Sequence, residues 1–246
     1  MCNSVLFRAG ILAVSMAILP AIPPHAHAAA PEESAANLFD ARDQGRLAVR
    51  FVPASEKKGT LTLSNRTRSP LTVRVPDTLG AVPAVLAQIL PGQMIAQRPD
   101  TPQMLGLALP GNAVIRQTAW GSERPGRLIQ IPARGQVRIV LQGVCLQHGN
   151  PTPNSRMHYE LVPLSHITRD PRLTAAIASL ANEAYAQPAV QLVAWHLANG
   201  RTFKSLRNKF SSREMKAAEQ LLQEVSAPAR PAPATPAPEY RADKAA

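Results

Sequence analysis

The sequence predicts an α+β protein in which an immunoglobulin-like antiparallel β-sandwich is followed by a small helical region. Three observations favour this fold class. Short segments within residues 45–147 alternate apolar and polar side chains, which is typical of half-buried strands. About seven such strands, separated by turn residues, match the size of an immunoglobulin-like sandwich. From residue 148 onward, helical spacing of apolar residues replaces this alternation.

The first strands follow from this alternation in chain order. Apolar and polar residues alternate from Leu47 to Phe51, and Pro53 ends the segment. The segments 60–64 and 71–75 alternate in the same way. The Asn, Ser and Pro residues between these two segments supply turn chemistry, so we expect them to form a hairpin.

The later strands are separated by a segment without strand character. The stretch 89–112 is rich in Pro, Gly and Gln and is expected to be a long loop. Pro83 would confine the strand that contains it to a sheet edge, because proline donates no ladder hydrogen bond. The remaining strands are expected at 81–88, 113–116, 127–131, 136–144 and 159–162.

Capping residues mark the expected helices. Asp170 followed by Pro171 predicts the start of the first helix. A second helix is expected to begin near Pro188 and to end at Gly200, a residue suited to the position after a helix. The segment 211–214 has the pattern of a capping box and predicts a third helix.

The N-terminal segment predicts export. A mostly apolar run leads into Ala26-His27-Ala28, a cleavage-site pattern typical of a Sec-type signal peptide. No later segment offers about 18 uninterrupted apolar residues, so no transmembrane segment is expected. We expect a periplasmic, cell-surface or extracellular protein. Its expected segments are a signal peptide (1–28), a flexible lead (29–44), the β-sandwich (45–147), a loop and helical region (148–226) and a disordered Ala/Pro-rich tail (227–246).

The chain is basic, with 27 Lys and Arg against 16 Asp and Glu, a net charge of +11. Such an excess attracts polyanions, and an anionic envelope polymer is one expected partner. Arg46, Arg50, Arg74 and Arg138 stand at alternate positions of candidate strands and are expected to form a solvated outer face. Aromatic residues make up only 4% of the chain, which leaves few rings for base stacking. Specific nucleic-acid binding is therefore not expected.

Common catalytic motifs are missing from the sequence. It contains no G-x-S-x-G elbow, no H-E-x-x-H pair, no C-x-x-C pair, no phosphate-binding loop and no dinucleotide fingerprint. We therefore expect a binding protein rather than an enzyme, and no cofactor.

Removal of the signal peptide would leave Cys145 as the single cysteine, so it could not form an internal disulfide. Together with His148 and His196 it offers the ligand types of a blue-copper site. The upstream histidine that such sites use has no counterpart between residues 28 and 145. A metal site is therefore a less favoured alternative, and no metal is expected.

A cysteine at the end of a strand and a glutamine in the first turn of a helix are what an internal thioester requires. The Cys145 thiolate would attack the Gln191 carboxamide and release ammonia, leaving an acyl group that is reactive toward amines. Trp195, one turn after Gln191, would form a wall of the pocket. His148 or His196 would assist proton transfer.

At these residues the sequence resembles the thioester domains of bacterial surface adhesins. That family pairs an apolar-Cys-apolar-acid motif with an apolar-Gln-x-x-apolar-Trp motif, which Val144-Cys145-Leu146 and the segment 190–195 match. Gln147 stands where the family has an acid, and the two motifs are closer in sequence than in that family. The resemblance covers only these two segments, and it implies covalent attachment to a surface protein amine.

Four segments, at 49–51, 65–76, 145–149 and 194–200, also make the sequence similar to a group of exported bacterial proteins without a known activity. Two interpretations stay open from the sequence. The protein is either a covalent, adhesin-like binder, or a reversible protein- or glycan-binding module in which Cys145 is buried and inert.

Overall fold

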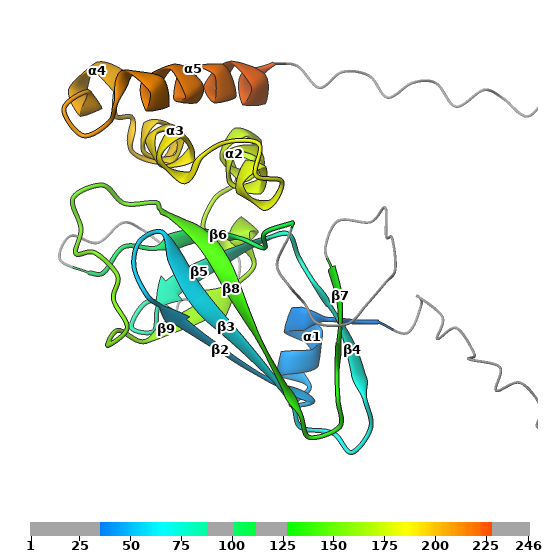
Figure 1. Cartoon of the computed structure of the whole chain (residues 1–246). Coiled ribbons are helices and arrows are strands. Elements are labelled where there is room, and N and C mark those ends of the chain that lie inside the picture. The colour runs from blue at the N-terminus through cyan, green and yellow to red at the C-terminus, as the bar shows by residue number, and fades with distance from the viewer. Residues whose placement is uncertain (1–34, 88–100, 112–126, 228–246) are drawn as a thin grey trace, which may run out of the picture. The chain divides into compact units, whose positions relative to one another are not determined.

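The computed structural model describes residues 35–87, 101–111 and 127–227 (Figure 1). The strands in these segments are β1 (Ala36–Asn37), β2 (Leu47–Pro53), β3 (Lys58–Asn65), β4 (Leu71–Val75), β5 (Thr78–Pro83), β6 (Leu105–Ala108), β7 (Arg127–Ile131), β8 (Gln136–Cys145) and β9 (Tyr159–Val162). The helices are α1 (Leu38–Asp43), the 3-10 turn η2 (Leu164–His166), α2 (Pro171–Ala181), α3 (Gln187–Asn199), α4 (Phe203–Leu206) and α5 (Ser212–Ser226).

Six of the described strands close into a barrel with the order β2-β3-β8-β6-β5-β9. All of its pairs are antiparallel, and β9 closes the ring by pairing with β2 through Tyr159 and Phe51. The strands β1, β4 and β7 form a separate three-stranded sheet. The α+β class and the mostly antiparallel strands are thus confirmed. The expected immunoglobulin-like sandwich is wrong. A sandwich consists of two sheets with open edges, whereas β5 pairs with both β6 and β9 and so helps to close the six strands into a barrel.

The predicted hairpin between β3 and β4 is also wrong, because these strands belong to different sheets. The buried side chain of Asn65 stabilises the crossing. Its Nδ2 donates to the carbonyl oxygens of Ser69, Ile131 and Pro132 at 2.8, 3.2 and 3.1 Å, and its Oδ1 accepts from the Thr67 N–H at 2.8 Å. The Asn65 side chain therefore joins the connection between β3 and β4 to the connection between β7 and β8.

The expected loop at 89–112 contains a strand, β6, which the alternation rule missed. All four of its residues are buried, because one face lines the barrel and α2 covers the other. A strand buried on both faces has no polar alternation. Residues 84–87, predicted as part of a strand, form a turn after β5. The predicted strand at 113–116, the signal peptide and residues 228–246 of the predicted tail lie outside the described residues.

Part of the segment expected as a flexible lead forms β1 and α1 instead. Asn37 caps α1 by accepting the Phe39 N–H at 2.8 Å. Leu38 and Ala41 are fully buried in the core that the barrel shares with β4 and β7. The burial of these two side chains orders β1 and α1. The segment is too short and too polar for a helical pattern to be recognised in its sequence.

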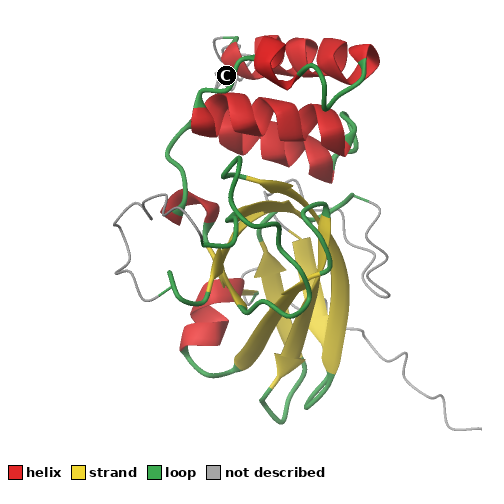
Figure 2. Cartoon of the chain, turned by 90° about the vertical axis from the view of Figure 1, so that its left-hand side faces the viewer, coloured by secondary structure: helices red, strands yellow, loops and turns green. Residues whose placement is uncertain are grey.

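The three main helices form where the capping residues predict them. Asp170 accepts the Arg172 N–H at the start of α2, Gly200 ends α3 with a φ of 63°, and Ser211 and Glu214 form the capping box of α5. Figure 2 shows α2, α3 and α5 gathered beyond one end of the barrel. The helices α2 and α3 contact barrel strands, whereas α5 packs on α2 and α3. Within the described residues, no helix is long and apolar enough to cross a membrane.

Two apolar cores result from this arrangement. The barrel core includes Leu61, Leu63 and Leu141, and the helix core joins α2, α3 and α5 to the outside of the barrel. The end of β8 contributes to both. Val144 and Leu146 face the helix core, whereas Cys145 between them belongs to the barrel core, as the alternation of side chains along a strand requires.

Candidate functional site

The side chain of Gln191 is hydrogen-bonded to the main chain of Cys145. The Cys145 N–H donates to Gln191 Oε1, and Gln191 Nε2 donates to the Cys145 carbonyl oxygen, both at 2.8 Å. Gln191 is 5% exposed and Cys145 1% exposed. The carboxamide therefore pairs with Cys145 as a residue of a neighbouring strand would, and both of its polar atoms are engaged.

Gln191 takes this position because β8 is longer than the strand beside it. Pairing between β3 and β8 ends where Lys58 lies opposite Gln142, so the last residues of β8 have no strand on that side. Gln187, one helical turn before Gln191, donates from Nε2 to the Gly143 carbonyl oxygen at 3.1 Å. The two glutamines of α3 thus complete the edge of β8 and attach the helix to the barrel.

The Cys145 thiol lies on the barrel-core side of β8 rather than among the helices. Burial, with a smaller contribution from the negative charge of Glu56, raises the pKa of this thiol to about 12. At neutral pH the group is therefore a thiol, whereas the nucleophile of thioester formation is a thiolate.

A pocket of about 230 Å³ lies beside Gln191 and Trp195. Three parts of the chain line it: the connection between β2 and β3, the helix α3, and the start of α5 with the residues directly before it. The lining residues are Glu56, Lys57, Gln187, Pro188, Gln191, Trp195, Lys209, Phe210 and Glu214. The pocket thus contains two of the residues predicted for the site, and Cys145 does not line it.

Trp195 is the aromatic centre of this region. Its ring meets the rings of His148 and Phe210 edge to face, with centroids 4.6 and 6.0 Å apart. The Lys209 ammonium lies 5.7 Å from the indole centroid. The indole Nε1 is buried and has no hydrogen-bond partner among the described residues. An unpaired buried donor of this kind is uncommon in folded proteins.

The two predicted histidines lie in different surroundings. His148 Nε2 is 3.2 Å from Lys209 Nζ, and the His148 ring packs on Trp195. Burial, followed by the charges of Lys209 and Arg201, lowers the pKa of His148. His196 instead turns toward the end of α3, where its Nδ1 is 2.8 Å from the Arg201 carbonyl oxygen. His148 therefore packs against Trp195, and neither histidine lines the pocket.

The alternative metal site is not assembled. Across the described part of the chain, no three His, Cys, Asp or Glu side chains lie together as possible metal ligands. Cys145 faces the barrel core, and the two histidines belong to the separate environments described above.

Sequence reasoning missed the polar residues that complete the pocket. Glu56 and Lys57 come from a turn between two strands, and Lys209 and Phe210 directly precede the capping box of α5. The only sequence signal was indirect: the capping box predicts a helix start, and residues there are held at fixed positions.

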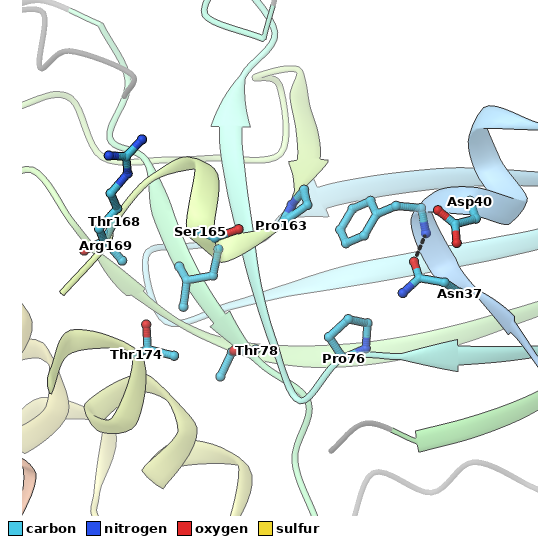
Figure 3. A pocket seen from close by; sticks show the side chains of 11 residues that line it. Asn37, Asp40, Pro76, Thr78, Pro163, Ser165, Thr168, Arg169 and Thr174 are labelled. Atoms are coloured by element: carbon cyan, nitrogen blue, oxygen red, sulfur yellow. Dashed lines mark hydrogen bonds between the residues drawn. The ribbon is translucent and has the colours of Figure 1, made fainter. Parts of the chain in front are cut away.

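A second, more open hollow of about 720 Å³ lies where α1, the start of β5, η2 and α2 meet (Figure 3). Asn37 and Asp40 lie at one side of it, and Arg169 and Thr174 at the other. None of the residues predicted for the site lines this hollow, and Asn37 already uses its side-chain oxygen to cap α1.

Comparison of the chain with protein-family models, with curated proteins and with solved structures finds no match.

Proposed function

We propose that this protein is an exported, noncatalytic binding module that holds a sugar residue of a glycan reversibly in the pocket beside Trp195. The observation that carries the proposal is the pocket lining, which places the Trp195 indole beside amide, carboxylate and ammonium groups. An aromatic ring packs against the apolar face of a sugar, and polar side chains bind its hydroxyl groups. The export component rests on the predicted signal peptide at 1–28.

The charges in the lining favour an uncharged ligand group. Glu56 and Glu214 are balanced by Lys57 and Lys209, so the pocket has no formal net charge. A volume of about 230 Å³ suits one sugar ring rather than a long peptide side chain together with the residues that flank it. A single sugar within a longer glycan meets both conditions.

Fluorescence tests this proposal, because the chain has two tryptophans and Trp120→Phe leaves Trp195 as the only indole. Titration of that variant with neutral and anionic oligosaccharides is expected to shift its emission saturably for at least one glycan. Replacing Trp195 by Phe in the wild-type chain keeps an aromatic ring against His148 and Phe210 but reduces the aromatic surface that lines the pocket. Calorimetry with the same glycan is expected to give about ten-fold weaker binding, because less aromatic surface packs against the sugar ring. A panel without any saturable response would contradict the proposal.

A covalent function is the second candidate, because Cys145 and Gln191 are in direct hydrogen-bond contact and Gln191 also lines the pocket. In this chemistry the thiol sulfur bonds to the carboxamide carbon, the carbon–nitrogen bond breaks and ammonia leaves. An amine of a surface protein, held in the pocket, then displaces the thiol and forms an amide. His148 would assist through water, since it does not line the pocket.

Three observations favour the reversible function over the covalent one. Both polar atoms of the Gln191 carboxamide are engaged by the main chain, the thiol faces the barrel core, and its pKa is raised to about 12. Intact mass measured with and without methylamine separates the two. A mass one ammonia lighter than the sequence, absent in Cys145→Ala and replaced by a methylamine adduct in the wild type, would establish the thioester. A mass equal to the sequence in both conditions would exclude it.

A further inference from the structure

The outer face of β2, β3 and β8 carries arginines without acidic neighbours on the same strands. The exposed residues Arg50, Arg66, Arg68, Arg134 and Arg138, here called the arginine face, belong to these strands or to the connections that follow β3 and precede β8. Residues 58–75 and 127–145 contain no Asp or Glu. Within the described residues, none of the five forms an ion pair, and Glu160 on the next strand, β9, forms none with Arg50.

The pairing of the strands sets the spacing of these charges. Arg50 lies opposite Thr62 of β3, and Thr62 lies opposite Arg138 of β8. Because neighbouring strands are about 4.8 Å apart, the backbones of Arg50 and Arg138 are separated by about 10 Å across the face. A hydroxyl group stands between them at Thr62, and a second lies one row further along at Ser64.

The remaining three arginines are fixed at one end of the barrel. The Arg134 N–H donates to the Thr67 carbonyl oxygen at 3.1 Å, which joins the two connections that carry Arg66, Arg68 and Arg134. Figure 1 shows these connections side by side at the end of the barrel opposite to α2, α3 and α5. Asn65 holds both connections through the hydrogen bonds described above.

The backbone at Arg134 gives a second, independent observation. Its φ is 55°, in the left-handed region that favours glycine and costs energy for residues with a Cβ atom. An arginine at such a position keeps a charge on the surface at the expense of local stability, and strain of this kind is frequent at functional sites.

From this arrangement we infer that the arginine face binds an anionic polysaccharide. Guanidinium groups bind carboxylate and sulfate groups through paired hydrogen bonds, and the hydroxyl groups between them match a hydroxyl-rich polymer. Nucleic acid is the less suitable partner, because β2, β3 and β8 place no aromatic side chain on this outer face for bases to stack on. Three of the arginines lie at the far end of β3 from Lys57 and the Trp195 pocket, and Arg50 and Arg138 lie beside the middle of that strand. None of the five lines the pocket, so this binding does not depend on the proposed function.

Two variants with equal loss of charge test the inference. The first replaces Arg66, Arg134 and Arg138 by Gln. The matched control replaces Arg207, Arg213 and Lys216, exposed residues of the helical region, by Gln. Binding of full-length protein to heparin, with neutral dextran as a reference, is measured by calorimetry at several salt concentrations.

The first variant is expected to bind heparin about ten-fold more weakly than the wild type, with a shallower salt dependence, while the control changes little. Equal losses in both variants would mean that net charge alone attracts the polymer and would overturn the inference. Tighter binding to single-stranded DNA than to heparin would overturn the choice of polysaccharide.

Discussion

Gln191 acts as a strand residue at the end of β8, because its carboxamide exchanges two hydrogen bonds of 2.8 Å with the main chain of Cys145. A glutamine suits this position since it offers one donor and one acceptor at the spacing of a peptide group. Cys145 and Gln191 are the residue types that a thioester requires, but the Gln191 side chain contacts the main chain of Cys145. This interaction attaches α3 to the barrel.

Replacing Gln191 by Ala would leave the Cys145 N–H and carbonyl oxygen buried without partners. Because each unpaired buried group costs about 1–3 kcal/mol, the free energy of unfolding is expected to fall by about 2–6 kcal/mol. Gln187→Ala removes a single, half-buried hydrogen bond and is expected to cost about 1 kcal/mol. Urea unfolding of both variants measures the difference. Equal losses would contradict the structural role assigned to Gln191.

The reactivity of the Cys145 thiol provides the second prediction. Cys2→Ser makes Cys145 the only thiol of the chain. Because burial raises its pKa to about 12, alkylation by iodoacetamide at neutral pH is expected to be very slow in the folded protein and rapid in urea. Mass spectrometry of samples quenched at intervals measures both rates. Rapid and complete labelling of the folded chain would contradict the buried position of the thiol.

Alternation along the chain predicted the strands that are buried on one face only, such as β2, β4 and β8, and capping residues predicted α2, α3 and α5. The barrel could not be predicted in the same way. Its closure depends on the pairing of β9 with β2 and β5, segments that are far apart in the sequence and carry no local signal of their partners.

The same limit applies to the candidate site. Gln191 and Trp195 were predicted for it from their spacing on one helix, and both line the pocket. Glu56, Lys57, Lys209 and Phe210 reach it from segments that only the tertiary structure brings together. The direction of the Cys145 thiol follows from the register of β8, which places Val144 and Leu146 toward the helices and Cys145 toward the barrel.

The crossing between the two sheets gives the third prediction. In Asn65→Asp, a carboxylate would replace the Nδ2 group that donates to three carbonyl oxygens, so donors would become repulsive acceptors. The variant is expected to lose about 3 kcal/mol or more of the free energy of unfolding. Asn154→Asp is the matched control, since Asn154 is exposed and its Oδ1 accepts only the Arg156 N–H, which a carboxylate retains. Thermal unfolding of both variants tests this, and similar stabilities would argue against the role of Asn65.

The packing of His148 on Trp195 predicts a pH dependence of stability. Burial, then the charges of Lys209 and Arg201, lower the pKa of His148 below its ordinary value of 6.5. The folded state thus binds this proton more weakly than the unfolded state, so neutral His148 stabilises the fold above pH 6.5, and this contribution is lost as the pH falls through the folded-state pKa. Between about pH 7 and about pH 5, the free energy of unfolding of the wild type is expected to fall more steeply than that of His148→Gln. Urea unfolding at each pH measures the two slopes. Parallel slopes would show that His148 binds its proton equally in both states, contrary to its position between Trp195 and Lys209.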